Sequence, residues 1–204
     1  GQQEEFIRAD VLLYEPEYNA WRTLSPLAQA RRDAAAALVR LDSSDWRVLI
    51  VGGRNDVNGV LAALPVEVFD PVGETFFNAP QLPGNVNVFG AAAAAHDSVA
   101  HFVGGITTSN NPTDTPSRHH FRFRGTQSLQ EAFTTAAEMP TARVFASAAH
   151  VDNLLFVAGG YGSGGAELSV VEAYHTSLAK WMTPPAPALP QPRMRGVLAN
   201  LDGL

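Results

Sequence analysis

Short apolar runs alternate with polar turns along the whole chain. Three of these runs are five residues long and end at a pair of glycines: Arg47–Val51, Val99–Val103 and Leu154–Ala158. Apolar runs of about four to eight residues that are bounded by turn signals are typical of β-strands. We therefore predict a strand before each glycine pair.

The glycine pairs recur at a nearly constant spacing, with 52 residues from Gly52 to Gly104 and 55 from Gly104 to Gly159. A run of small residues precedes each pair, at 34–37, 91–95 and 146–149. A period of about 20 to 50 residues indicates a repeat architecture such as a solenoid or a propeller. The chain is therefore predicted to be built from repeated units.

Each unit continues after its glycine pair with a polar loop and a strand of alternating pattern. These strands begin at Val11, Val66, His120 and Val171. An aromatic residue then opens a last strand, and a proline turn closes the unit. The aromatics are Trp21, Phe76 or Phe77, Phe133 and Trp181, and the prolines are Pro26, Pro83, Pro140 and Pro190.

Doubled glycines in phase with an alternating strand and a closing aromatic resemble the kelch repeat, whose unit is a four-stranded propeller blade. The resemblance extends from about Val11 to Leu201. It implies an all-β, kelch-type β-propeller of about four blades, three complete and two partial, within a ring of six or seven.

The repeat gives an N-terminal extension at 1–10, a partial blade at 11–30, complete blades at about 31–83, 84–140 and 141–192, and a partial blade at 193–204. An inner strand is expected over Arg195–Leu201. Either further blades lie on other sequence, which we favour because no glycine-pair strand follows Leu204, or the partial blades meet and close a four-bladed ring. Open sheet edges would allow self-association.

The segment Arg31–Leu41 is rich in alanine, the best helix former, and in isolation it favours a helix. The same small-residue run recurs before every glycine pair. Because local propensity is a weak guide, the repetition favours a strand.

Composition narrows the classes of protein. Hydrophobic residues make up 46% and charged residues 17%, and there is no cysteine, which excludes disulfides and thiolate metal sites. No glycosylation sequon, signal peptide or initiator Met is present, so we expect a cytoplasmic protein and a shortened or processed chain. The net charge of −6 argues against nucleic acid or an anionic membrane as partner.

The loops after the glycine pairs are the candidate partner-binding sites. Val51–Asn55 resembles a motif of kelch substrate adaptors of cullin ubiquitin ligases, which implies that Arg54 contacts an acidic peptide; a solvated loop arginine is the alternative. Arginine suits this contact because its planar fork can hold a carboxylate. The candidate residues are Arg54, Asn55, Asn110, Asn111 and Tyr161.

Arg32, Arg143 and Arg193 recur once per unit. We predict a structural role, in which each arginine binds blade carbonyls or pairs with Glu67 or Glu172.

The six histidines show no metal-ligand spacing, and we predict surface or satisfied positions for them. His119 and His120 are adjacent on a strand, so they point to opposite faces and cannot chelate one metal together. The six are His96, His101, His119, His120, His150 and His175.

These observations predict a protein-interaction module of scaffold or substrate-adaptor type, with a protein or peptide partner and no cofactor or catalytic residues. The alternative is part of a kelch-fold enzyme of the sialic-acid epimerase type, or a regulatory domain beside an enzyme such as a phosphatase. The copper-radical oxidase variant fails because it needs a cysteine, which the chain lacks. Fold alone does not fix function.

Overall fold

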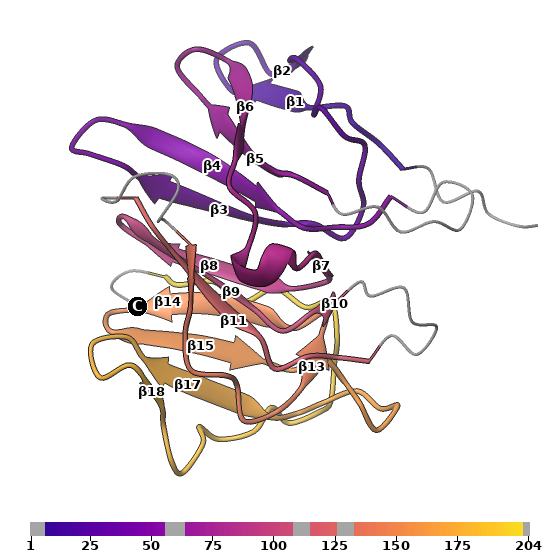
Figure 1. Cartoon of the computed structure of the whole chain (residues 1–204), viewed down its shortest axis with the longest axis vertical. Coiled ribbons are helices and arrows are strands. Elements are labelled where there is room, and N and C mark those ends of the chain that lie inside the picture. Colours follow the sequence, from indigo (N-terminus) through magenta and orange to yellow (C-terminus); the bar gives the residue numbers. More distant parts are fainter. Residues whose placement is uncertain (1–6, 56–63, 108–114, 126–132, 202–204) are drawn as a thin grey trace, which may run out of the picture.

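The computed structural model describes residues 7–55, 64–107, 115–125 and 133–201 (Figure 1). Within these residues, and apart from two smaller sheets described below, one two-stranded and three four-stranded antiparallel sheets follow one another along the chain. We call them the half-blade and the first, second and third blades. Their strands are β1 (Leu12–Glu15) and β2 (Ala20–Thr23); β3 (Ala35–Arg40), β4 (Trp46–Val51), β5 (Val66–Asp70) and β6 (Thr75–Ala79); β8 (Ala92–His96), β9 (Val99–Val103), β11 (His120–Arg124) and β12 (Phe133–Thr135); and β14 (Ser147–Val151), β15 (Leu154–Ala158), β17 (Val171–His175) and β18 (Lys180–Trp181).

Each complete blade has the same antiparallel order, in which every strand pairs with the next long strand of the chain. Short pairings also join the start of a blade to the residues that follow its glycine pair. These are the sheet of β7 (Val88–Phe89) with β10 (Ile106–Thr107), the sheet of β13 (Arg143–Val144) with β16 (Tyr161–Gly162), and the bridge of Arg32 with Arg54. One short 3-10 helix, η2 (Pro83–Asn85), connects the first and second blades. This is the predicted kelch-type propeller architecture.

The alanine-rich segment forms strand β3 and not a helix. Ala35, Ala37 and Val39 are buried while Ala36 and Leu38 alternate with them on the more exposed face. All six residues of β3 pair with β4, so tertiary pairing overrides the local preference of alanine. The inner strands β3, β8 and β14 border a hollow of about 550 Å³, and alanine is the commonest residue in its lining. Small side chains suit the crowded inner positions of a propeller.

A repeated aromatic pair closes the outer edge of each sheet. The pairs have ring centroids 4.8–5.3 Å apart, a distance at which aromatic rings stabilise each other. They are Tyr14 with Trp21, Phe69 with Phe76, Phe123 with Phe133, and Tyr174 with Trp181. Phe76, and not Phe77, is therefore the closing aromatic of the first blade.

Buried ion pairs hold the first and third blades. Arg143 Nη2 donates to Glu172 Oε2 at 2.7 Å, and its Nη1 donates to the carbonyls of Gly159 and Val170. Arg31 makes the same contacts with Glu67, Gly52 and Pro65.

The structural role is therefore confirmed for Arg143, but in the first blade Arg31 holds the position that was predicted for Arg32. The second blade has Val88 and Phe121 at the two positions, so both partners of the ion pair are replaced together. Arg193, the third of the predicted arginines, accepts a backbone hydrogen bond from Gly160 through its carbonyl.

A line of backbone hydrogen bonds joins the blades near the glycine pairs. Gly90 N donates to Asp33 O, Phe145 N to Gly90 O, and Arg195 N to Phe145 O, each at 2.8 Å. All four residues have positive φ, between 54° and 66°. The line fixes where each blade begins relative to the one before it.

The strand predicted over Arg195–Leu201 is not formed. Arg195 joins the line described above, but within the described residues no further strand lies beside this segment to build a ladder. Val197 is almost fully exposed as a result. No helix in the described part of the chain is long and apolar enough to cross a membrane.

Candidate functional site

The loops after the glycine pairs leave the propeller from equivalent places on one face, which we call the glycine-pair face. Gly53 N donates to Val88 O, Gly105 N to Arg143 O, and Gly160 N to Arg193 O, at 2.7–2.8 Å. In each case the acceptor belongs to the start of the next blade. The glycine pair therefore anchors every loop in the same way, whatever the sequence of the loop.

Arg54 lies in this face and is held by two neighbours. Its Nε is 3.4 Å from Asp33 Oδ2, and its guanidinium stacks over the ring of Phe89 at 4.6 Å. The side chain remains 26% exposed. Asn55 follows it, with a buried Oδ1 that has no hydrogen-bond partner. Arg54 and Asn55 therefore lie at the start of the first loop of the glycine-pair face, and their role in partner binding stays a prediction.

Tyr161 occupies the register of Arg54 two blades further on. It pairs with Val144 as Arg54 pairs with Arg32, and its side chain is exposed. Asn110 and Asn111 lie outside the described residues.

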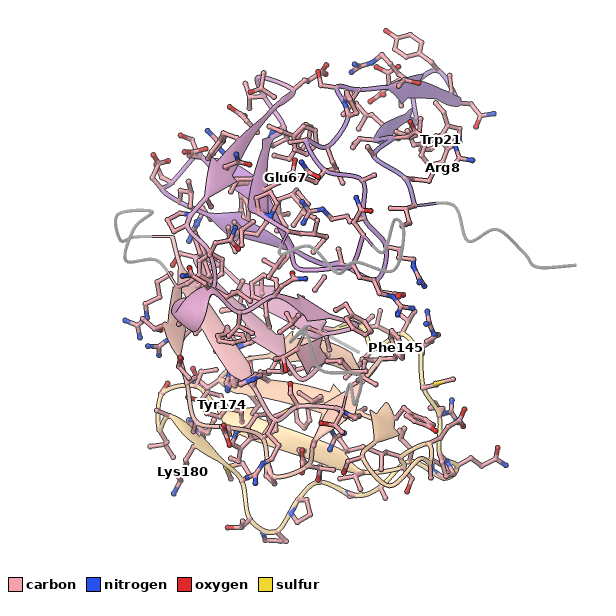
Figure 2. All side chains as sticks on the ribbon, turned by 45° about the vertical axis from the view of Figure 1, so that its right-hand side comes forward. Arg8, Trp21, Glu67, Phe145, Tyr174 and Lys180 are labelled. Carbon is pink, nitrogen blue, oxygen red and sulfur yellow. The ribbon has the colours of Figure 1, made fainter. Side chains whose placement is uncertain are left out.

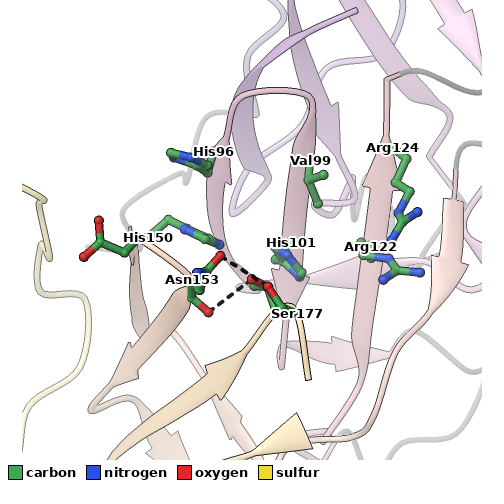
Figure 3. Close-up of a pocket in the computed structure, with 10 residues that line it drawn as sticks. His96, Val99, His101, Arg122, Arg124, His150, Asn153 and Ser177 are labelled. Atoms are coloured by element: carbon green, nitrogen blue, oxygen red, sulfur yellow. Dashed lines mark hydrogen bonds between the residues drawn. The ribbon is translucent and has the colours of Figure 1, made fainter. Parts of the chain in front are cut away.

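A second site lies at the opposite end of the strands, between the second and third blades (Figure 3). It is a cavity of about 240 Å³ that we call the histidine cavity. Its lining comes from strands β8, β9, β11 and β14 and from the β14–β15 and β17–β18 turns. The residues are His96, Val99, His101, Arg122, Arg124, His150, Asp152, Asn153, Thr176 and Ser177.

Two buried histidines of the second blade form a hydrogen-bonded relay behind this cavity. His101 Nδ1 lies 2.7 Å from His120 Nε2, and His120 Nδ1 lies 3.0 Å from the carbonyl oxygen of Ala137. A carbonyl only accepts, so His120 carries its proton on Nδ1 and offers a lone pair at Nε2. His101 must then donate from Nδ1, which leaves its Nε2 as a bare acceptor.

His101 Nε2 has no hydrogen-bond partner although the side chain is only 1% exposed. Trp181 Nε1 also donates to Ala137 O, at 2.8 Å, and this contact fixes the end of the relay. His150 stacks beside His101 with ring centroids 5.8 Å apart, and His96 stacks on His150 at 5.2 Å. His101 Nε2 is therefore a buried acceptor without a partner, and stacked rings pack beside it.

Burial favours the neutral form of His101, His120 and His150. It lowers the pKa of His101 to about 2, with a further contribution from His120, and lowers the pKa of His120 to about 4. Burial and the neighbouring His96 lower the pKa of His150 as well. A buried base without an acidic partner favours its uncharged form.

Two guanidinium groups give the cavity its charge. Arg122 and Arg124 alternate on β11 and both line the cavity. Burial and the proximity of Arg124 lower the pKa of Arg122, and Arg122 Nε is buried without a hydrogen-bond partner. The lining also includes one acidic residue, Asp152.

The interface between the second and third blades differs from the interface between the first and second blades. In the second blade His101 pairs with Arg122 across the strands, whereas the matching pair of the first blade is Leu49 with Val68. Leu49 and Val68 are part of the buried core between the first and second blades.

His120 likewise replaces Val66, which also belongs to that core. The second blade thus has polar side chains at positions where the first blade has a hydrophobic core.

The sequence prediction of satisfied or exposed histidines is wrong for His101. The pairing of the blades brings together residues that are far apart in the sequence, so no spacing motif marks the cluster. A comparison of the repeats position by position would have found it. Within the described residues, no group of three or more His, Asp or Glu is placed to hold a metal ion.

Comparisons with known proteins agree with this architecture. The kelch motif model matches residues 142–187, which include the third blade. A solved structure described as "Structure of YjhT" superposes with a TM-score of 0.74 at 17% identity, over 99% of this chain and 69% of that chain. No curated protein matches the chain. The doubled glycines, the four-stranded blades and these matches together make the chain a kelch-repeat β-propeller.

Proposed function

We propose that this propeller segment is a protein-interaction module of scaffold or substrate-adaptor type, which binds a protein or peptide partner through the loops after its glycine pairs. The observation that carries the proposal is the common anchor of these loops. Three different loops start from equivalent hydrogen bonds to the next blade. A rigid scaffold that presents variable loops is a frequent design for recognition.

The chemistry of Arg54 favours an acidic partner. Its stack on Phe89 and its contact with Asp33 hold the guanidinium plane in one orientation. A pre-oriented fork loses less conformational entropy when it binds a carboxylate. Tyr161 adds an exposed aromatic ring at the equivalent position of the third blade, and tyrosine is enriched among the residues that dominate binding energy.

We further propose that the module is not an enzyme, that it works in the cytoplasm, and that nucleic acids and membranes are not its partners. The net charge of −6 and the absence of cysteine are the observations behind these proposals. Measurable turnover by the full-length protein would contradict the first of them, and imaging of the tagged full-length protein tests the second. Retention on heparin or on anionic vesicles would contradict the third.

The test is a binding comparison between the wild type and two variants of the glycine-pair face, Arg54→Glu and Tyr161→Ala. A partner captured by the wild type should be lost with Arg54→Glu and weakened with Tyr161→Ala. It should be retained by Lys180→Glu, which changes an exposed residue of β18 at the opposite ends of the strands. A photoreactive residue at position 161 should cross-link to the same partner. Retention by both glycine-pair variants would place the binding surface elsewhere.

Self-association through the sheet edges is a separate proposal. Edge strands offer unpaired N–H and C=O groups to another chain. Light scattering after size exclusion should show a concentration-dependent dimer, and a monomer at all concentrations would contradict it.

A further inference from the structure

Arg122 and Arg124 line the histidine cavity without a carboxylate partner. They are two residues apart on β11, so their side chains leave the strand on the same face (Figure 3). Among the described residues, no acidic side chain forms an ion pair with either arginine, and this includes Asp152 of the same lining. Burial and, after it, the charge of Arg124 lower the pKa of Arg122. The two guanidinium groups are therefore close enough to repel each other in the unliganded protein.

The repeat shows that a blade does not need these two arginines. Arg122 takes the position of Val68 in the first blade, which is buried in the core. Arg124 takes the position of Asp70, whose Oδ2 lies 3.3 Å from Nη2 of Arg47 in an ion pair. The second blade therefore has two positive charges where the first blade has an apolar residue and a paired acid. Residues that depart from the rule of the repeat in this way are expected at functional sites.

The donors that reach the cavity come from both blades. Arg122 Nε is buried, whereas its Nη1 makes no hydrogen bond within the described residues and is not buried. The side chain of Arg124 is exposed. On the third blade, Ser177 Oγ lies 3.3 Å from Asn153 Oδ1, which leaves the amide Nδ2 of Asn153 as a donor (Figure 3). An anion in the cavity can therefore be held from two sides.

The number of donors and their charge favour a phosphate monoester. Each guanidinium can donate two parallel N–H bonds, and two such forks match the three free oxygens of a phosphate better than the two oxygens of a carboxylate. A phosphate monoester carries close to two negative charges at neutral pH, one for each arginine. The cavity volume of about 240 Å³ corresponds to roughly eight water molecules at about 30 Å³ each, which leaves room for a phosphate and a small substituent.

We propose that the histidine cavity binds the phosphoryl group of a small phosphate monoester, with Arg122 and Arg124 holding its oxygens and Asn153 donating from the neighbouring blade. The bound anion offsets the repulsion between the two guanidinium groups. The site goes beyond the partner-binding role proposed above and does not depend on it, because the cavity lies at the opposite ends of the strands from the glycine-pair face.

The test compares methyl phosphate with methyl sulfate at pH 8, since the two anions have nearly the same shape but carry about two charges and one charge. NMR titration of the whole chain should show methyl phosphate bound at least about fivefold more tightly, because one further unit charge gives about that factor even in water. The largest shifts should lie at Arg122, Arg124 and Asn153. Equal affinities, shifts at the glycine-pair face, or binding of a phosphoserine peptide but not of methyl phosphate would overturn the proposal.

Two variants use residues that the chain itself has at the matching positions of the first blade. Arg124→Asp copies Asp70 at an exposed position and should weaken methyl phosphate at least about tenfold through the reversed charge. Arg122→Val copies Val68 and should remove most of the preference over methyl sulfate. Arg8→Gln changes an exposed arginine outside the cavity and should leave both affinities unchanged. If Arg122→Val fails to fold, Arg124→Asp decides, and retained affinity for methyl phosphate in that variant overturns the proposal.

Discussion

His101 Nδ1 lies 2.7 Å from His120 Nε2, and both rings are buried within the second blade. The pair continues to Ala137 O, so one backbone carbonyl sets the protonation of two side chains. Figure 2 shows Tyr174, whose ring packs edge-on against His120 with centroids 4.6 Å apart, in the third blade. Tyr174 therefore fixes the orientation of the His120 ring, and Ala137 O fixes which of its nitrogens carries the proton.

The first prediction concerns the tautomers. At pH 7, long-range ¹H–¹⁵N spectra should show both His101 and His120 protonated at Nδ1 and bare at Nε2, because Ala137 O can only accept. His175, which lies outside the cavity, serves as the reference ring. A proton on His101 Nε2 would contradict the relay.

The second prediction concerns stability against pH. The pKa of His101 is lowered to about 2 and that of His120 to about 4 in the folded chain, from 6.5 in the unfolded chain. Below pH 6.5 the unfolded state therefore binds more protons than the folded state. The free energy of unfolding falls as the pH falls below 6.5.

From pH 6.5 down to about 4, urea unfolding should show a loss of about 1.4 kcal/mol per pH unit for each of the two histidines. The double variant His101→Leu/His120→Val should lose correspondingly less over the same range. An equal pH dependence in the two proteins would show that these rings are not the cause.

The third prediction is a double-mutant cycle. His101→Leu alone should destabilise the fold by about 1–3 kcal/mol, because it leaves His120 Nε2 buried and unpaired. Adding His120→Val removes that orphaned acceptor and should recover most of the loss. Both replacements match Leu49 and Val66 of the first blade. Urea denaturation measures the cycle, and additive losses would contradict the coupling.

The fourth prediction tests the register of the repeated arginine. Arg31→Met leaves Glu67 buried without its ion pair and should cost about 3–5 kcal/mol in the free energy of unfolding. Arg32→Met is the matched control, since its side chain is partly exposed beside Asp33, and should cost about 1 kcal/mol or less. Similar losses for the two neighbours in chemical denaturation would argue against the observed register.

The fifth prediction concerns the glycine pairs. Gly104 has φ of 69°, and a Cβ there would lie 2.4 Å from the carbonyl oxygen of Arg143. Gly104→Ala should therefore destabilise the chain by more than the roughly 1–2 kcal/mol of a left-handed residue alone. Gly164→Ala, where a Cβ would meet no atom within 4 Å, should change the melting temperature little. Equal melting temperatures would show that the pair is not a close approach of backbones.

The repeat could be predicted from the sequence because its marks are local. The glycine pairs occupy positions where the backbone has positive φ, and each closing aromatic packs on an aromatic of the neighbouring strand in the same sheet. The sequence could not show that Arg31, and not Arg32, pairs with Glu67. The two arginines are adjacent, and only the fold determines which of them points inward. The strand expected over Arg195–Leu201 failed because a strand needs a partner, which periodicity does not supply.

The sequence likewise predicts one of the two candidate sites and not the other. Arg54 and Tyr161 follow glycine pairs, so their common register was readable from the chain. The histidine cavity was not, because His101 and His150 approach each other through the packing of two blades. Interactions between blades depend on the twist and spacing of whole sheets, and no short motif encodes those.

Because of the line of hydrogen bonds from Asp33 through Gly90 and Phe145 to Arg195, the position of one blade relative to the next does not depend on the number of residues in a blade. Its members are 57, 55 and 50 residues apart, yet each step is one amide donating to one carbonyl at 2.8 Å. Residues can therefore be inserted or deleted in the loops of either face without moving the next blade. Such a chain can exchange these loops freely during evolution, and an engineer could graft new ones between the same anchors.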